Sequence, residues 1–374
     1  MKKLCFYINS DWYFNLHWKE RALAAKEDGY EVHVICNFES AKIFREFELS
    51  GIKPHDSRMS EQSLNPLVMF RDLVRSLQII RKIKPDILHC ITIKPCLIGG
   101  FYAKVFRKKL VLSFVGLGRV FSSNAKKYKI LKHSVSAFYR WVSKKKDIFF
   151  IFEHEMDRDK IILITGVDPT KTIVIDGAGI DTEKFEYLNE PDNTPPAVLF
   201  ASRLIWSKGL SDLIEARKVL LQRGVHFNLV VAGITVKKDP DAIPDDVIRN
   251  WSEAEDIIWL GQRDDVKTLI EQANIVALPS VYAEGVPRIL IEAAAVGRPS
   301  ISYDMGGCSS IIVNNCTGFI VDKNIDDLAR KLEILITNKK LRMDFGVNAR
   351  AWVMSRFCST YVIKRTLGVY NELE

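Results

Sequence analysis

Short apolar runs alternate with longer segments of helical spacing along most of the chain. At 18–28, Trp18, Ala22 and Ala25 have the spacing of one helix face, and Gly29 is a good C-terminal stop. Further runs before residue 176 have the length and composition of strands, at 3–9, 31–36, 87–91, 110–114, 148–152 and 172–175. Strands that alternate with helices predict a parallel sheet covered by helices on both faces.

A second series of the same kind begins at residue 197. It predicts strands at 197–201, 228–232, 257–260, 275–278 and 299–303, and helices at 209–222, 266–272, 287–296 and 325–336. Between the two series, residues 187–196 form a polar, proline-rich run of the kind found in linkers. The tail from Arg350 onward is predicted as helix.

These patterns predict an α/β protein with two Rossmann-like, doubly wound domains that face a central cleft, where ligands of such folds bind. We place the N-terminal domain at 1–187, the linker at 188–196 and the C-terminal domain at 197–355. We expect residues 356–374 to form a C-terminal helix that packs back on the N-terminal domain.

Composition narrows the class of protein. The chain has 374 residues, of which 47% are hydrophobic and 27% charged, as in globular proteins. Its longest apolar stretches are far shorter than the roughly 20 residues that span a bilayer, and the polar residues after 3–9 argue against a signal peptide. The seven cysteines lack CxxC spacing, which favours reduced thiols in a cytoplasm over a disulfide scaffold or a zinc site.

The net charge of +8 is unevenly distributed, because no acidic residue lies between Asp86 and Asp147. A solvated basic face is the simplest explanation for any single lysine there. An acid-free interval of this length favours an anionic binding partner. The candidates are lipid headgroups, a lipid diphosphate or nucleic acid. Aromatic residues interspersed with the cations favour an anionic membrane surface.

The segment 278–297 is the richest in candidate chemistry. Pro287 suits the first turn of a helix, so the amides of Arg288, Ile289 and Leu290 are expected among the unpaired donors of a helix start, which is a phosphate site. Glu284 before the helix and Glu292 within it would suit sugar and ribose hydroxyls. The alternative is a plain strand-to-helix turn with a surface glutamate at each end.

This segment resembles the E-x7-E motif of the family 4 retaining glycosyltransferases, reading E-G-x-P-x-x-x-x-E from Glu284 to Glu292. Other segments resemble further motifs of that family in the same order along the chain. They are G-x-G-I-D-x-x-x-F at 177–185, R-L-x-x-x-K-G at 203–209, G-x-R-x-D-V at 261–266, and G-G followed by T-G-x-x-V at 306–321. Five collinear matches are far more specific than one.

The resemblance implies the GT-B fold, a UDP-sugar donor, no metal or other cofactor, and retention of anomeric configuration. It gives Arg203 and Lys208 the donor diphosphate, Glu284 the transferred sugar and Glu292 the ribose. Fixed cations suit a leaving group that gains charge as the glycosidic bond breaks. The other implied donor-binding positions are Gly233, Arg263, Gly285, Val286, Pro287, Arg288 and Ile289.

Two departures from the family pattern change the picture. Ser310 stands where the family commonly has a glutamate, and the loop after the first strand, 9–17, lacks the usual glycines. That loop, with the segments 89–95 and 115–121, resembles a subgroup that elongates glycans on polyprenyl diphosphate. The implied or suspected acceptor-side residues are Asp11, His17, Thr92, Lys94, Gly116, Gly118, Arg119 and His154.

The leading hypothesis is a retaining glycosyltransferase of surface polysaccharide biosynthesis. It would move an N-acetylhexosamine or hexose from a UDP-sugar to an undecaprenyl-diphosphate-linked saccharide, from a cytoplasmic position on the inner face of the plasma membrane. A nucleotide-sugar epimerase of the same architecture is the second hypothesis. A nucleic-acid-binding protein is the third, but it leaves Arg203, Lys208, Glu284 and Glu292 unexplained.

Overall fold

The computed structural model describes residues 1–60, 63, 65–117, 120–121, 126–236, 239–282 and 285–374, leaving aside the side chains of 126–128 and 130. The chain forms two compact units. The first combines Met1–Gly179 with Ser359–Glu374, and the second is the continuous segment Ile180–Cys358. Among the described residues, no helix combines the length and the hydropathy needed to cross a bilayer.

The first unit is built on a seven-stranded parallel sheet. Its strands are β1 (Lys3–Ser10), β2 (Glu31–Asn37), β3 (Lys53–Asp56), β4 (Ile87–Ile91), β5 (Lys109–Phe114), β6 (Ile148–Phe152) and β7 (Thr172–Val174). They are ordered β3-β2-β1-β4-β5-β6-β7, so the strand order reverses between β1 and β4. Ligands of open α/β sheets bind at such a switch point, outside the carboxyl ends of the strands.

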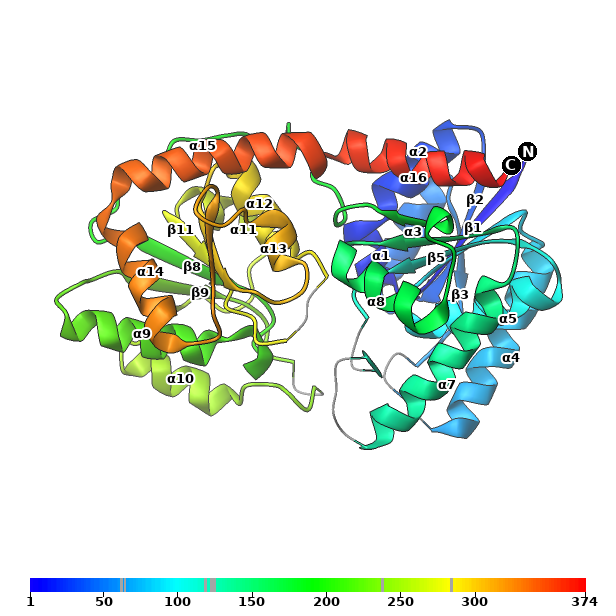
Figure 1. Ribbon diagram of the computed structural model, residues 1–374, viewed down its shortest axis with the longest axis horizontal. Coiled ribbons are helices and arrows are strands. Elements are labelled where there is room, and N and C mark those ends of the chain that lie inside the picture. The colour runs from blue at the N-terminus through cyan, green and yellow to red at the C-terminus, as the bar shows by residue number, and fades with distance from the viewer. Residues whose placement is uncertain (61–62, 64, 118–119, 122–125, 237–238, 283–284) are drawn as a thin grey trace. The chain divides into compact units, whose positions relative to one another are not determined.

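Helices cover both faces of this sheet, as Figure 1 shows. One face packs against the helices α4 (Pro66–Ile83), α5 (Ile93–Val105), α7 (Lys126–Ser143) and α8 (Glu155–Thr165). The other packs against α1 (Asp11–His17), α2 (Lys19–Glu27), α3 (Ala41–Leu49) and α16 (Ser359–Leu373). Strands buried on both sides explain the continuous apolar runs in the sequence.

The last helix, α16, completes the core of the first unit beside α2 (Figure 1). Its Tyr370 is fully buried, and the Tyr370 hydroxyl lies 2.7 Å from Nδ1 of His89 on β4. The other ring nitrogen of His89 lies 2.7 Å from the Ser113 hydroxyl, so both nitrogens are used inside the core. Burial lowers the pKa of His89 well below its ordinary value. His89 is therefore a neutral structural residue that joins α16 to the sheet.

The second unit repeats the same strand order in a six-stranded parallel sheet, β10-β9-β8-β11-β12-β13. Its strands are β8 (Ala197–Ala201), β9 (Asn228–Ala232), β10 (Ile258–Trp259), β11 (Ile275–Ala277), β12 (Ser300–Tyr303) and β13 (Gly318–Val321). Its helices are α9 (Leu210–Gln222), α10 (Asp245–Glu253), α11 (Val266–Glu271), α12 (Arg288–Val296), α13 (Cys308–Ile311), α14 (Ile325–Thr337) and α15 (Lys339–Arg356). The switch point lies between β8 and β11.

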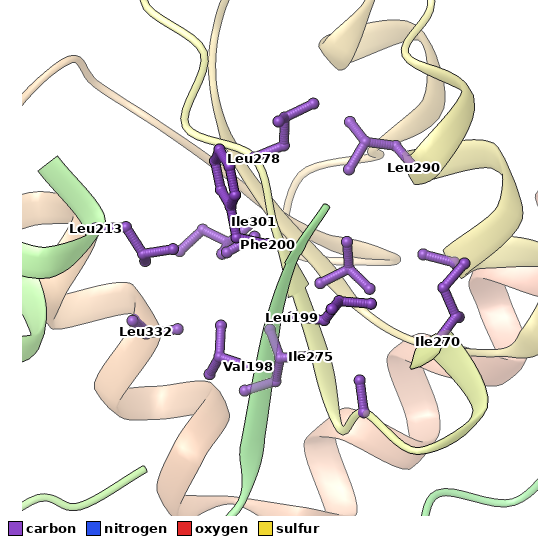
Figure 2. Packing of buried hydrophobic residues seen from close by; sticks show 14 of the residues in the cluster. Val198, Leu199, Phe200, Leu213, Ile270, Ile275, Leu278, Leu290, Ile301 and Leu332 are labelled. Carbon is purple, nitrogen blue, oxygen red and sulfur yellow. The ribbon is translucent and has the colours of Figure 1, made fainter. Parts of the chain in front are cut away.

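The core of the second unit is a sheet held between two helical layers (Figure 2). Leu213 of α9 and Leu332 of α14 pack on one side of the β8 residues, and Ile270 of α11 and Leu290 of α12 pack on the other. All four side chains are buried. Burying each of them stabilises the fold by about 1.5–3 kcal/mol before the entropy of ordering is subtracted.

The boundary between the units differs from the predicted one. Residues 188–196 were expected to be a linker, but they belong to the second unit. The Glu190 carboxylate accepts two hydrogen bonds from the buried Arg342 guanidinium, at 2.8 and 3.0 Å. Arg298, also buried, donates to the carbonyls of Leu188 and Asn189. Partners far along the chain therefore immobilise this polar run, and the chain passes between units at Gly179–Ile180 and Cys358–Ser359.

Candidate nucleotide-sugar site

Three loops meet at the carboxyl edge of the second sheet because glycines let their backbones approach closely. A Cβ atom on Gly209 would lie 1.9 Å from the Pro279 carbonyl oxygen, and one on Gly307 would lie 2.4 Å from that of Gly285. Gly209 also has φ +79°, in the left-handed region that favours glycine. The loops after β8, β11 and β12 are therefore in contact around the switch point, and residues 203–209 and 285–292 share this edge.

Lys208 lies in this loop cluster. It ends a short 3-10 helix, Trp206–Lys208, which follows β8, and its residue is only 9% exposed. The next residue, Gly209, begins α9, and the Ser207 carbonyl accepts hydrogen bonds from the amide of Val281 and the hydroxyl of Ser280. A buried cation between the first turn after β8 and the loop after β11 suits an anionic ligand.

Arg203 lies two residues after the end of β8, and its side chain is half exposed. Its Nη1 lies 3.9 Å from a carboxylate oxygen of Asp239, whose side chain is only 6% exposed. Asp241, two residues on, accepts a hydrogen bond from the amide of Ser207. These aspartates were not predicted as site residues, although their position after β9, in an Asp-Pro-Asp turn, places them at the same edge of the sheet.

Helix α12 starts one residue later than predicted. Pro287 is its N-cap, with φ −67° and ψ 123°, rather than its first helical residue. A proline has no side-chain acceptor for the first amides of the helix, which favours an external anion there. The amide of Leu290, expected to be unpaired, instead donates to the Pro287 carbonyl at 3.1 Å. Of the three predicted donors, the amides of Arg288 and Ile289 remain predictions.

Glu292 and Arg288 form an ion pair one turn apart on α12. Nε of Arg288 donates to Oε1 of Glu292 at 2.8 Å. Burial raises the pKa of Glu292, and the charge and hydrogen bond of Arg288 oppose that shift. Arg288 thus favours the ionised form of a buried carboxylate, which is the form that accepts hydrogen bonds from two vicinal hydroxyls.

The structure describes all but one of the remaining residues that were predicted to bind the donor. Gly233 follows β9, and its backbone lies close to the backbone of Ser202 after β8. A Cβ atom on Gly233 would lie 1.9 Å from the Ser202 carbonyl oxygen. Arg263 lies exposed before α11, and its guanidinium binds the carboxylate of Asp265 through Nε and Nη2. Val286 is buried and Ile289 partly buried at the start of α12. Glu284 lies outside the described residues.

The first sheet has its own switch point, formed by the ends of β1 and β4. Thr92 follows β4 and is the N-cap of α5, with φ 72° and ψ 162°, a conformation that costs a non-glycine residue about 1–3 kcal/mol. Its hydroxyl donates to the Asn9 side chain at 3.1 Å. Strain of this kind concentrates at functional sites, so the predicted acceptor-side position of Thr92 gains a physical argument. Asn9 was not predicted.

Two charged residues predicted on the acceptor side, Asp11 and Lys94, make hydrogen bonds that hold loops in place. The buried Asp11 carboxylate accepts hydrogen bonds from the amides of Glu39 and Ser40, at 3.0 and 2.9 Å, and so ties the loop before α3 to the start of α1. Lys94 donates to the carbonyls of Ser60 and Ser63, at 2.6 and 2.7 Å. These contacts position the loops around the first switch point.

The other acceptor-side predictions lie on different elements. His17 ends α1, with its ring centroid 4.2 Å from that of Tyr13 at a tilt of 36°, and Gly116 follows β5 with φ +97°. His154 is buried as the N-cap of α8, where its Nδ1 accepts from the amide of Asp157 at 3.4 Å. That bond makes His154 a capping residue. Gly118 and Arg119 lie outside the described residues.

Comparison with known protein families agrees with this arrangement of both units. A family model described as "Glycosyl transferases group 1" matches residues 181–352, and one described as "Glycosyl transferase 4-like" matches residues 3–151. Together they cover nearly all of the two sheets.

Two curated relatives are similar over most of the chain. The N,N'-diacetylbacillosaminyl-diphospho-undecaprenol alpha-1,3-N-acetylgalactosaminyltransferase of Campylobacter jejuni is 25% identical over 337 residues, which is 86% of each chain. The UDP-Gal:alpha-D-GlcNAc-diphosphoundecaprenol alpha-1,3-galactosyltransferase of Escherichia coli is 24% identical over 320 residues, or 81% of this chain and 79% of the relative.

Solved structures share the architecture at lower sequence identity. A glycosyltransferase from Rickettsia africae superposes with a TM-score of 0.77 at 21% identity, covering 100% of this chain and 98% of its own. Anabaena HepE, solved with UDP and glucose, gives a TM-score of 0.78 at 16% identity with both chains fully covered. The paired Rossmann-like sheets, the collinear motifs and these similarities show that the chain belongs to the family 4-like, group 1 glycosyltransferases and is an enzyme with the GT-B fold.

Proposed function

We propose that this glycosyltransferase moves an N-acetylhexosamine or hexose from a UDP-sugar to an undecaprenyl-diphosphate-linked saccharide, with retention, in the biosynthesis of a surface polysaccharide of the O-antigen or capsule type. The printed names of two relatives describe transfer to saccharides on diphospho-undecaprenol. The HepE structure was solved with UDP and glucose. These similarities support the classes of donor and acceptor in the proposal.

The observation that carries the donor assignment is the gathering of Lys208, Gly209 and the start of α12 at one switch point. The Gly209–Pro279 approach brings the loop after β8 against the loop after β11, which leads into α12. In the proposed role, Lys208 and Arg203 would stabilise the charge that builds up on the diphosphate as the glycosidic bond breaks. Glu292, held by Arg288, would accept the ribose hydroxyl hydrogens.

Glu284 would bind the hydroxyls of the transferred sugar, as the family motif implies. In a retaining reaction on one face of the sugar, the acceptor hydroxyl attacks as the diphosphate leaves. The departing phosphate oxygen then takes the proton of that hydroxyl, so the protein needs to supply no separate base. The residues of this chain would act by orienting the donor and holding the developing charge.

The acceptor would lie against the first unit, whose residues between Asp86 and Asp147 include no acid. A polyprenyl diphosphate is anionic and lies in a membrane. We therefore propose that the enzyme associates peripherally with an anionic membrane surface, on the inner face of the plasma membrane.

A screen of nucleotide sugars tests the donor proposal. A ligand present at 100 times its Kd stabilises the folded state by about 2.7 kcal/mol and raises the Tm. UDP-sugars should raise the Tm more than GDP- or dTDP-sugars, and the effective one should support transfer to a lipid-diphosphate saccharide. A new nucleotide sugar formed without acceptor would instead identify an epimerase.

Metal independence is a separate part of the proposal. Transfer measured in excess EDTA should equal transfer in its absence, because the cations Arg203 and Lys208 would hold the diphosphate. Activity that vanishes in EDTA and returns with Mg²⁺ or Mn²⁺ would contradict this part and leave the transferase assignment intact.

A further inference from the structure

The first unit has an apolar groove that the donor chemistry does not use. It lies between the N-terminal half of α4 and the first three turns of α5 and has a volume of about 310 Å³, within the range of small-ligand sites. Its lining is Met59, Met69, Phe70, Asp72, Leu73, Lys94, Leu97, Ile98 and Phe101. Phe70 is 66% exposed and Phe101 42% exposed, so large apolar side chains face solvent along it. Exposed apolar surface of this kind marks binding sites.

The groove begins at the edge of the sheet where the switch point lies. Helix α5 follows β4, and its lining residues Lys94, Leu97 and Phe101 recur at the spacing of one helix face. From Lys94 to Phe101 the helix rises about 10 Å. The groove therefore runs from the carboxyl edge of the sheet, next to the strained Thr92, down the outer side of the sheet.

A cation lies at the mouth of the groove. Lys94 is held there by hydrogen bonds to the carbonyls of Ser60 and Ser63. The Asp72 carboxylate in the lining accepts from the Ser60 amide and lies 3.3 Å from a guanidinium nitrogen of Arg71. Asp72 is also the sole acid in the sequences of α4, α5 and α7, which otherwise carry lysines and arginines. The mouth thus suits an anionic group.

The far end of the groove continues into an aromatic and basic surface. The ring of Phe101 lies 6.5 Å from that of Trp141 on α7, and Nζ of Lys104 lies 5.6 Å from the Trp141 ring centroid. Helices α4, α5 and α7 lie side by side on this face (Figure 1). Exposed aromatic rings among cations are typical of surfaces that meet anionic bilayers.

We propose that this groove binds the isoprenoid chain of the lipid-linked acceptor, in the part of the chain that adjoins the diphosphate. The inference rests on the proposed acceptor and adds the place where its lipid is recognised. One ligand then matches the three features in order. Its diphosphate lies near Lys94 and the switch point, its first isoprene units fill the groove, and the rest of its chain passes the Trp141 surface toward the bilayer.

Direct binding tests the groove without relying on turnover. Farnesyl diphosphate should bind the full-length protein at least about tenfold more tightly than inorganic diphosphate, because only the prenyl chain buries apolar surface. The double variant Phe70→Gln/Phe101→Gln should lose about tenfold in affinity for farnesyl diphosphate and keep its affinity for inorganic diphosphate. Val74→Gln is the matched control, since Val74 is an exposed apolar residue of α4 outside the groove.

Other results would overturn the proposal. Equal binding of the two diphosphates, or unchanged farnesyl diphosphate binding in the double variant, removes the groove as a prenyl site. If the double variant instead loses binding to phosphatidylcholine vesicles while keeping farnesyl diphosphate binding, the groove takes bilayer acyl chains. A concentration-dependent dimer that the double variant abolishes would identify a second copy as the occupant.

Transfer assays separate failure of the groove from failure of the proposed function. With a saccharide on undecaprenyl diphosphate the double variant should show a raised KM, whereas with a short-chain diphosphate carrier it should match the parent enzyme. If the parent enzyme transfers sugar to neither carrier, the proposed acceptor is wrong. The farnesyl diphosphate measurement then still decides whether the groove binds prenyl chains.

Discussion

The two sheets of the enzyme share a strand order and differ in what they place at the switch point. In the second unit, backbones approach to distances that only glycine allows. The neighbouring turns carry buried Lys208 and buried Glu292, which is paired with the partly buried Arg288. In the first unit, the strained Thr92 lies beside an apolar groove and a basic helical face. The shared topology predicts where ligands bind, and in our proposal the side chains make one edge the nucleotide-sugar site and the other the lipid-diphosphate site.

The largest effect is expected at the donor edge. Lys208→Ala should lower kcat by about 10²–10³, because it removes a fixed cation from the charge that develops on the diphosphate. Steady-state transfer with saturating acceptor measures this, and the thermal unfolding of the variant should match the parent. Lys218→Ala, on the exposed side of α9, is the control and should leave kcat unchanged. Parent-like turnover in Lys208→Ala would remove the second unit's edge as the donor site.

Close backbone approach in the second unit can be tested with a pair of glycines. Gly209→Ala should lower the free energy of unfolding by about 3 kcal/mol or more, because the new Cβ would meet the Pro279 carbonyl and φ is +79°. Gly224 has a similar φ of +75°, and a Cβ atom there would have no atom within 4 Å. Gly224→Ala should therefore show the cost of the positive φ without the cost of a steric clash. Denaturant unfolding measures both. Equal losses would mean that the loops after β8 and β11 are not tightly packed.

The basic face of the first unit should matter for membranes and not for the donor. Lys129→Gln/Lys132→Gln on α7 should weaken binding to phosphatidylserine vesicles by about 2 kcal/mol at low salt, or roughly 30-fold. Lys323→Gln/Lys340→Gln, with the same change in net charge in the second unit, is the control and should bind vesicles as the parent does. Equal loss in both variants would show that net charge alone, not this face, drives binding.

The smallest effect is expected at Arg288, which acts through Glu292. Arg288→Gln should raise the KM for the donor several-fold, with a smaller change in kcat, because the buried carboxylate loses its partner. The pKa of Glu292 is already raised by burial, and without Arg288 it rises further. The acid limb of the kcat/KM profile should therefore move to higher pH, and Arg288→Lys should move it part of the way back.

The same pair makes a stability prediction of definite sign. A carboxyl group whose folded pKa lies above its unfolded pKa favours the folded state when protonated, and that contribution is lost as pH rises through the folded pKa. Arg288→Gln raises the folded pKa further. The stability lost by this variant should accordingly be small at acid pH and grow toward neutral pH. A loss of stability that is the same at every pH would show that Arg288 does not affect the titration of Glu292.

Buried parallel strands could be predicted closely from the sequence. The bounds of β4, β6, β8 and β9 agree with the prediction because a strand covered on both faces is a continuous apolar run. The edge strand β3 was missed, since Lys53–Asp56 is polar and contains Pro54. The start of α15 at Lys339 was placed too late, although Asn338 caps it by accepting a hydrogen bond from the amide of Leu341.

The proposed donor residues come from motifs whose spacing is local. Arg288 and Glu292 lie one turn apart on a helix, and their pairing could have been read from the sequence. The hydrogen bonds of Asp11 could not be predicted from the sequence, because they come from the amides of Glu39 and Ser40, which are 28 and 29 residues away. Residues 188–196 were misjudged for the same reason, since Arg298 and Arg342 lie far along the chain.

The path of the chain has a consequence for synthesis on the ribosome. The second unit is one uninterrupted stretch, so it can fold as soon as residue 358 has emerged. The first unit, although it begins earlier, lacks Val369, Tyr370 and Leu373 of its core until the segment after the second unit has been made. Nascent chains should therefore gain protease resistance first in residues 180–358, the reverse of the usual order.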